Sequence, residues 1–211
     1  MAYKRYKNKA GKVLKGVTTI TENLGWNKRV LVNWANRIGL QGTTTAEYTD
    51  PLKRIGTLGH AISLEQVGGD KPEYDKYTKD EINRAENCAL SFFEWMKGKK
   101  IEGLKVEHRM VSEEHQFGGT CDFYAIVDGY YELIDLKTGS GIYEESKIQV
   151  AGGYTMLMEE HHHPVDRVRI LNIPRSEGES FNESIITKNI FLYQQIFKHL
   201  LDIDKLRKEV K

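Results

Sequence analysis

An Asp-Gly dipeptide, Asp128-Gly129, divides two apolar segments and constrains the fold more than any other feature of the chain. The flanking residues Thr120–Val127 and Tyr130–Lys137 are rich in aromatic and β-branched side chains, as strands are. A two-residue Asp-Gly loop between such segments favours a tight antiparallel hairpin. Val127 then faces Tyr130, and this one pair sets the register of the whole hairpin.

The same register brings two carboxylates together. Asp122 faces Asp135, with Cβ atoms roughly 5 Å apart, and Lys137 lies two residues further on the same side of its strand. Facing carboxylates repel each other. A divalent cation between them would turn this unfavourable interaction energy into a favourable one. We therefore predict a metal site at Asp122 and Asp135 with Lys137 beside it. Surface carboxylates at a sheet end, with Lys137 as an ion-pair partner of Asp135, are the alternative.

Length and composition limit the class of protein. A chain of 211 residues suits one domain with a buried core, and a net charge of +1 indicates no particular partner. Its two cysteines, Cys88 and Cys121, exclude a disulfide scaffold and a four-cysteine zinc or iron–sulfur site within one chain. No apolar run approaches the ~18 residues of a membrane span, and the N-terminus lacks a signal-peptide core. We expect a cytoplasmic protein without membrane contact.

Positive charge gathers at the N-terminus. We predict a basic arm over residues 1–16, followed by a single domain over residues 17–211. Such an arm can follow the phosphates of a nucleic acid, and a solvated terminal tail is the alternative. The candidate DNA-binding residues are Lys4, Arg5 and Lys7.

The order of predicted elements indicates the fold class. Residues 17–20 are expected to form a short strand or an extended lead-in, and residues 42–50 a polar loop. Without the extra N-terminal helices, the order is αβββαβ followed by a C-terminal helix, with the fourth strand parallel to the third. The predicted class is α/β (α+β), a mixed sheet flanked by helices. Helices are expected over residues 28–38, 51–67, 79–97, 144–160 and 188–207, and strands over 105–111, 120–127, 130–137 and 165–173.

These features resemble the PD-(D/E)XK nuclease superfamily. Gly118-Gly-Thr-Cys-Asp122 followed by Asp135-Leu-Lys137 is similar to its signature, and the αβββαβ order is similar to its restriction-endonuclease-like core. Asp122, Asp135 and the backbone carbonyl of Leu136 offer the hard oxygen ligands that Mg²⁺ and Mn²⁺ prefer. The resemblance covers about residues 17–175.

Two upstream motifs resemble the RecB-like and phage-exonuclease branch of that superfamily. His60, in Gly56-Thr-Leu-Gly-His60, resembles a histidine that joins the metal site, and Glu65 lies on the same predicted helix. Glu107 resembles an acidic residue of the first strand. The alternatives are a structural histidine, a solvated helix face for Glu65 and a salt bridge between Glu107 and Arg109.

A downstream motif resembles the Gln-and-Tyr helix motif of the same branch. Gln149 and Tyr154 carry this likeness, but they are five residues apart where the family spacing is four. Gly152-Gly153 precedes the tyrosine, so either the helix is locally irregular or Tyr154 is not the equivalent residue. Residues 17–20 followed by Trp34 are similar to the lead-in of several phage-type members.

The resemblance implies a Mg²⁺- or Mn²⁺-dependent nuclease that hydrolyses DNA phosphodiester bonds, with an exonuclease of phage or recombination type favoured. Implied partners are DNA and a recombination protein, in the host cytoplasm if the chain is phage-encoded. One alternative is a structure-specific or nicking endonuclease; another is a non-catalytic nucleic-acid-binding protein that keeps the fold. The catalytic residues would be Asp122, Asp135, Lys137 and Gln149.

Overall fold

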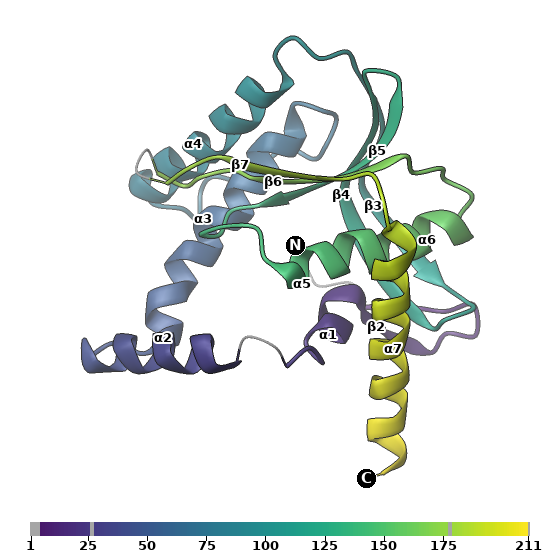
Figure 1. Ribbon diagram of the computed structural model, residues 1–211. Helices are drawn as coiled ribbons and strands as arrows, with labels where there is room; N and C mark the ends of the chain where they lie inside the picture. Colours follow the sequence, from purple (N-terminus) through teal and green to yellow (C-terminus); the bar gives the residue numbers. More distant parts are fainter. Residues whose placement is uncertain (1–4, 26–27, 177–178, 211) are drawn as a thin grey trace.

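The structure, a computed structural model, describes residues 5–25, 28–176 and 179–210. Within these residues seven strands form one mixed sheet in the order β1-β2-β4-β5-β6-β7, with β3 paired to β4. Helices flank the sheet (Figure 1), so the predicted α+β class is confirmed. The strands are β1 (Tyr6–Lys7), β2 (Val13–Gly16), β3 (Ile101–Ser112), β4 (Phe117–Val127), β5 (Tyr130–Lys137), β6 (Arg167–Asn172) and β7 (Asn182–Ile186).

Most predicted helices are present. The predicted helix over residues 144–160 is one continuous segment, whose middle part is a π-helix, and the strand that follows it is parallel to β5 as predicted. The helices are α1 (Val17–Thr21), α2 (Lys28–Leu40), α3 (Thr45–Glu65), α4 (Lys79–Met96), α5 (Glu144–Lys147), the π-helix η1 (Ile148–Tyr154), α6 (Thr155–Glu160) and α7 (Ile190–Glu209).

The segment over residues 17–20 differs from the prediction, because it is helical rather than extended. Val17, Ile20 and Thr21 are its buried residues, and their spacing of three and four is that of one helix face. The extended chain ends one residue earlier, at Gly16 in β2. The run of β-branched residues predicted a strand, and burial of one helical face against the sheet outweighed that local preference.

The polar loop predicted over residues 42–50 is also wrong, since α3 begins at Thr45 and passes through Pro51. The Thr44 hydroxyl accepts a bond from the Glu47 backbone N–H, and the Glu47 carboxylate accepts one from the Thr44 N–H. This capping box satisfies the first free N–H groups of the helix. The Thr-x-x-Glu pattern is present in the sequence, but a proline is common in the first turn of a helix and therefore predicts a start at Pro51.

Apolar side chains are buried on both faces of the sheet. The larger cluster joins α1, η1, α6 and α7 to one face, and the second cluster joins α4 to the other. Figure 1 shows α4 on one side of β6 and β7 and the crossover segment α5–α6 on the opposite side. Helices thus cover both faces of the sheet, and polar side chains that point from its strands toward these helices are shielded from water.

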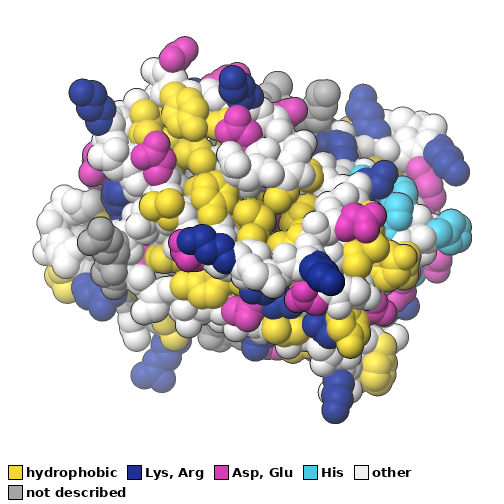
Figure 2. Space-filling view, turned by 90° about the horizontal axis from the view of Figure 1, so that it is seen from above, with side chains coloured by type: hydrophobic (Ala, Val, Ile, Leu, Met, Phe, Trp, Pro, Cys, Tyr) yellow, Lys and Arg dark blue, Asp and Glu magenta, His cyan; other side chains and the backbone are white. Residues whose placement is uncertain are grey.

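The surface gives no uniform electrostatic signal. Figure 2 shows basic and acidic side chains interspersed over the face in view, in agreement with the net charge of +1. In the part of the chain that the structure describes, no helix combines the length and the apolar character needed to cross a membrane. Local groups of charges, rather than the overall field, must therefore select a ligand.

Candidate metal centre

The centre lies where β4 and β5 separate. The predicted hairpin register is confirmed from Val127 opposite Tyr130 to Phe123 opposite Ile134, and the ladder then stops one residue before Asp122 and Asp135. Further along the same edge of β4, β2 takes the place of β5. Because β2 pairs with β4 at Phe117 and Gly118 and β5 pairs with it from Phe123 onward, β2 and β5 leave a gap along this edge. We call this gap the fork, and the Asp122 carboxylate lies in it.

Strand β4 and its neighbour β3 are both distorted beside Asp122. Cys121 and Tyr124 pack in one core cluster while Phe123 packs in the other, so the alternation of β4 side chains breaks beside Asp122. On the neighbouring strand, Glu107 has a positive φ of 46°, and the register of its neighbours places it opposite Asp122. Left-handed backbone in a residue other than glycine is strained and occurs often at functional sites.

The two predicted carboxylates make different contacts. Asp122 Oδ2 accepts a hydrogen bond of 2.8 Å from the backbone N–H of Leu136. Lys137 Nζ lies 2.8 Å from Asp135 Oδ2, an ion pair that leaves this buried oxygen without a well-directed hydrogen bond. The side chain of Asp135 is 5% exposed. The structure thus brings Asp122, Asp135 and Lys137 together as predicted.

Burial dominates the electrostatics of the centre. It raises the pKa of Asp135 to about 6, an effect that Lys137 opposes and Asp122 adds to. Burial also raises the pKa of Asp122. For Lys137, burial alone would lower the pKa, but the attraction of the two carboxylates outweighs it and the pKa is raised. One ammonium is thus shared by two carboxylates, and negative charge is in excess at neutral pH.

His60 reaches the fork from α3. Its Nδ1 lies 3.7 Å from Asp122 Oδ2, and its ring bonds to the backbone carbonyl of Leu136. Burial lowers the pKa of His60 to about 4, with a further contribution from Lys137, so the imidazole is neutral at pH 7. A neutral imidazole keeps a lone pair for a metal ion.

A glycine allows this approach of α3. A Cβ atom on Gly56 would lie 2.4 Å from Thr138 Oγ1, immediately after β5. Because a Cβ atom here would collide with the Thr138 side chain, glycine lets α3 lie close against the end of β5. The Gly-Thr-Leu-Gly-His sequence therefore has a packing reason that is independent of any family likeness.

The five-residue spacing of Gln149 and Tyr154 is explained by η1. Both residues lie in this π-helix, where residues five apart are neighbours, and Gln149 Nε2 donates a bond of 3.0 Å to the Tyr154 hydroxyl. Gln149 Oε1 in turn lies 3.4 Å from Lys137 Nζ. The local irregularity that the sequence left open is present, and it brings the two side chains together.

Gly152 fixes the position of the π-helix. A Cβ atom at Gly152 would lie 2.6 Å from the backbone oxygen of Tyr193 in α7. The close approach of η1 to α7 needs a residue without a side chain, which accounts for the glycine placed before Tyr154. The extra residue of the motif is thus accommodated by one wide helical turn against α7.

Of the other predicted site residues, Glu107 lies near the centre, whereas Glu65 and the basic residues of the N-terminus have no contact with it in the described residues. Burial and then Asp70 raise the pKa of Glu107, and its charge acts on Asp122. It forms no salt bridge with Arg109 among the described residues. Glu65 instead has Tyr74 as its electrostatic neighbour. Arg5 and Lys7 are exposed on the β1–β2 hairpin, and Lys4 lies outside the described residues.

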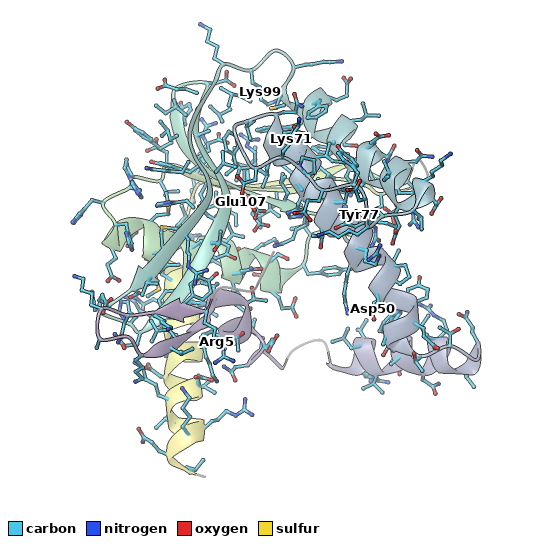
Figure 3. All side chains as sticks on the ribbon, turned by 180° about the vertical axis from the view of Figure 1, so that it is seen from behind. Arg5, Asp50, Lys71, Tyr77, Lys99 and Glu107 are labelled. Atoms are coloured by element: carbon cyan, nitrogen blue, oxygen red, sulfur yellow. The ribbon has the colours of Figure 1, made fainter. Side chains whose placement is uncertain are left out.

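A cavity of about 700 Å³ adjoins the centre. Its lining includes His60, Glu107 and Thr138 together with Lys71 and Tyr77. Figure 3 shows Glu107 on the strands, with Lys71 and Tyr77 on the side of α3 and α4. The volume lies within the range of small-molecule sites.

The donor set fits a hard divalent cation. Across residues 5–25, 28–176 and 179–210, no three His, Cys, Asp or Glu side chains converge as a ready metal cluster. Asp122 instead has pairwise contacts with His60 and with the Leu136 backbone, and Asp135 lies beside Lys137, so these donors would have to draw closer together to hold one ion. The buried Asp135 oxygen has the Lys137 ammonium at 2.8 Å but no well-directed hydrogen bond, and a carboxylate oxygen is the kind of ligand that Mg²⁺ or Mn²⁺ takes.

Two residues of the centre were missed. Thr18 Oγ1 accepts a bond of 3.1 Å from Gln149 Nε2, and Tyr6 influences the pKa of Tyr154. Both come from the N-terminal segment, which was predicted as a basic arm and an extended lead-in. Only the long-range pairing of β2 with β4 brings them near, and no local pattern of the sequence signals it.

Comparisons with known proteins do not define a family. No protein-family description matches the chain, and no curated protein matches it. Among solved structures, the chain is similar to the one described as "Crystal structure of SSO0001", with 12% identity, a TM-score of 0.33 and coverage of 72% of this chain and 74% of that chain. Likeness at this level carries no conclusion about activity, which must come from the residues at the fork.

Proposed function

We propose that the chain is a divalent-metal-dependent nuclease that hydrolyses DNA phosphodiester bonds, with exonuclease action favoured. One observation carries the proposal: Asp135 is buried and Asp122 is partly buried at the fork, and the two share a single ammonium, that of Lys137. Excess buried negative charge destabilises a fold. A hard divalent cation bound at the fork would offset this negative charge, so the arrangement suits a metal site.

Each residue of the fork has a role in this chemistry. Asp122, Asp135 and the Leu136 carbonyl would hold Mg²⁺ or Mn²⁺, with His60 as a further ligand. A divalent cation held by these residues would acidify a water molecule and offset charge on the phosphoryl oxygens. Lys137, next to Asp135, directs the attacking water and stabilises the negative charge that develops on the phosphate.

Gln149 acts through Lys137 rather than on the substrate. Its amide nitrogen donates to Tyr154 and Thr18, so its oxygen is turned toward Lys137 Nζ. This arrangement limits the directions that the ammonium can take. We therefore assign Gln149 as a positioning residue of the same site.

Exonuclease action is supported by two features. The Gly56–His60 motif resembles that of exonuclease-type nucleases. The cavity of about 700 Å³ next to Glu107 and Thr138 offers space for a nucleotide unit at a strand end. DNA as the substrate follows from the same resemblance.

The test is degradation of labelled DNA by purified protein, with and without Mg²⁺. Duplexes labelled at the 5′ or the 3′ end report polarity, and linear, circular and nicked DNA separate an exonuclease from an endonuclease. Asp122→Asn, Asp135→Asn and Lys137→Ala should each abolish Mg²⁺-dependent degradation while folding persists. Asp202→Asn, which removes a carboxylate from an exposed position on α7, serves as the matched control.

Two results would overturn the assignment. Full activity in two of the three centre variants would place the chemistry elsewhere. Absence of Mn²⁺ binding at millimolar concentration in a calorimetric titration would favour a non-catalytic nucleic-acid-binding protein. Cleavage of closed circular DNA, by contrast, would keep the nuclease and replace the exonuclease with an endonuclease.

A further inference from the structure

An arginine, Arg109, and a tyrosine, Tyr6, form a pair at the border of the metal centre. The guanidinium carbon of Arg109 lies 4.2 Å from the ring centroid of Tyr6, and the Tyr6 hydroxyl lies 3.0 Å from Thr120 Oγ1. Arg109 faces Thr120 across β3 and β4, two residues from Asp122 along β4. Because a strand rises about 3.4 Å per residue, the pair is about 7 Å from the fork along the strand direction.

Arg109 is exposed and has no carboxylate partner among the described residues. Glu107 is two residues away on the same strand, yet its pKa responds to burial and to Asp70, not to Arg109. An arginine beside an acidic site that forms no ion pair is free to bind an anion. Other arginines of the described chain do bond to carboxylates, among them Arg54, Arg167, Arg169 and Arg175.

The tyrosine ring orients the guanidinium. Contact with the ring occupies one face of the group, while its N–H donors lie in the plane and point outward. Planar guanidinium groups bind phosphate through two parallel hydrogen bonds. A guanidinium that is already held in place loses less side-chain entropy when it binds.

The N-terminal hairpin that carries Tyr6 is fixed to the sheet. Asn8 Nδ2 donates a bond of 2.9 Å to Gln116 Oε1, and the Lys9 backbone N–H donates one of 2.6 Å to Glu113. A Cβ atom on Gly118 would lie 2.5 Å from the Tyr6 ring, so the ring needs this glycine to lie against β4. Tyr6 is therefore part of a rigid platform and not of a terminal tail.

Further positive charge lies on the same hairpin. Arg5, Lys7 and Lys12 are exposed on the same hairpin. Figure 3 shows Arg5 on the hairpin and Glu107 nearer the middle of the sheet, with Lys71 beyond it. The basic side chains thus lie on one side of the centre and the cavity on the other.

We propose that Arg109, held by Tyr6, binds a backbone phosphate of the nucleic acid next to the phosphate that is cleaved. The inference rests on the proposed function, because the nuclease reaction at Asp122 makes a nucleic-acid strand the occupant. Arg109 is a positioning residue in this assignment: it sets the strand in register with the fork and takes no part in bond cleavage. Backbone contacts of this kind fix position without reading bases.

The experiment measures binding of a fluorescent DNA duplex to the full chain in EDTA, over a series of salt concentrations. Each phosphate contact contributes about 0.9 to the slope of log K against log salt for duplex DNA. Arg109→Gln should lower the slope by about 0.9 and weaken binding at low salt, whereas Arg109→Lys should keep the slope. In Mg²⁺, Arg109→Gln should raise KM more than it lowers kcat.

Matched variants separate phosphate binding from a structural role. Lys100→Gln removes one exposed charge at the far end of β3, about 30 Å from Arg109 along the strand, and should leave the slope unchanged. Tyr6→Phe keeps the ring and should keep the slope, while Tyr6→Leu should weaken binding. If Arg109 only holds the hairpin in place, Arg109→Gln will lower the melting temperature and leave the slope at the wild-type value, which overturns the inference.

The outcomes for the two proposals are distinct. Binding that depends on Arg109, without hydrolysis in Mg²⁺, would refute the nuclease and support the phosphate contact. Hydrolysis with an unchanged slope in Arg109→Gln would refute the phosphate contact alone. Absence of duplex binding by the wild-type chain at low salt would also refute it.

Discussion

Strand β5 carries two buried carboxylates, three residues apart, whose surroundings are opposite. Glu132 is fully buried and receives bonds of 2.5 and 2.8 Å from Arg169, with Arg167 at 3.4 Å. Asp135 is almost as deeply buried, but it has only Lys137 as a counter-charge and shares it with Asp122.

The Glu132 group continues into a closed network. Arg169 also bonds to Glu183 on β7, and Glu183 accepts a bond of 2.8 Å from the Trp95 indole. Burial would lower the pKa of Arg169, but its bonds to Glu132 and Glu183 raise it above its usual value. Every charge in this group is paired, and the network joins β5, β6, β7 and α4.

The difference separates a fully compensated charge from a partly compensated one within one strand. Paired charges such as Glu132 and Arg169 fix the arrangement of neighbouring strands at little cost. The charge of Asp135 is only partly compensated, because Lys137 is shared with Asp122, and incompletely compensated buried charge costs stability and is common at functional sites. The comparison predicts that substitutions at the two sites act on different properties.

Asp135→Asn should have the largest effect. Loss of a ligand that stabilises transition-state charge by several kcal/mol lowers the rate about 10³- to 10⁴-fold. Stability should not fall, because Lys137 keeps Asp122 as a counter-charge and the excess negative charge is gone. Measured activity and melting temperature should therefore move in opposite directions; a loss of both would show that Asp135 is structural.

Glu132→Gln should do the reverse. It leaves Arg169 buried with one acid fewer, and breaking a buried pair of this kind costs about 3–5 kcal/mol of unfolding free energy. Denaturant unfolding measures the loss, and Mg²⁺-dependent activity per folded molecule should stay at the wild-type value. Reduced activity in fully folded protein would contradict the division between the two sites.

The hairpin and its register were predictable because they depend on local chemistry. Asp128-Gly129 sets the turn, the turn sets the pairing of β4 with β5, and Lys137 follows by alternation. The convergence of His60 with Asp122 was anticipated from a motif rather than from physics, and the structure adds the close contact of Gly56 with Thr138 that permits it.

Other parts of the site depend on contacts that the sequence does not reveal. Thr18 and Tyr6 reach the centre through the pairing of β2 with β4, more than a hundred residues away in the chain. The distortion at Glu107 has no sequence signal, since its positive φ occurs in a residue that ordinarily avoids it. The π-helix was indicated only by the spacing of Gln149 and Tyr154.

Addition of Mg²⁺ should stabilise the wild-type chain. A ligand that binds only the folded state at 100 times its Kd contributes about 2.7 kcal/mol. Thermal unfolding in EDTA and in excess Mg²⁺ measures the shift, which should vanish in Asp135→Asn and persist in Glu132→Gln. An equal shift in Asp135→Asn would show that the cation binds away from the fork.

The smallest expected effect is a pH dependence of the Asp135→Asn substitution in EDTA. Burial raises the folded-state pKa of Asp135 from 3.8 to about 6, so its ionised form destabilises the fold above pH 6 and the penalty fades as the pH falls toward 3.8. Asp135→Asn should therefore be more stable than the wild type by about 3 kcal/mol at pH 7 and by about 1 kcal/mol at pH 4.5.

The difference between the two proteins is the quantity to measure, because His60 acts with the opposite sign. Burial lowers its pKa to about 4, so the neutral imidazole stabilises the fold above pH 6.5 and that stability is lost as the pH falls through 4. The part of the His60 contribution that comes from burial is common to both chains and cancels, while loss of Asp135 lowers the pKa of His60 further and reduces the advantage of Asp135→Asn at low pH in the same direction. A difference that is constant between pH 4.5 and 7 would mean that Asp135 has an ordinary pKa, and its excess charge could then not be the mark of a metal centre.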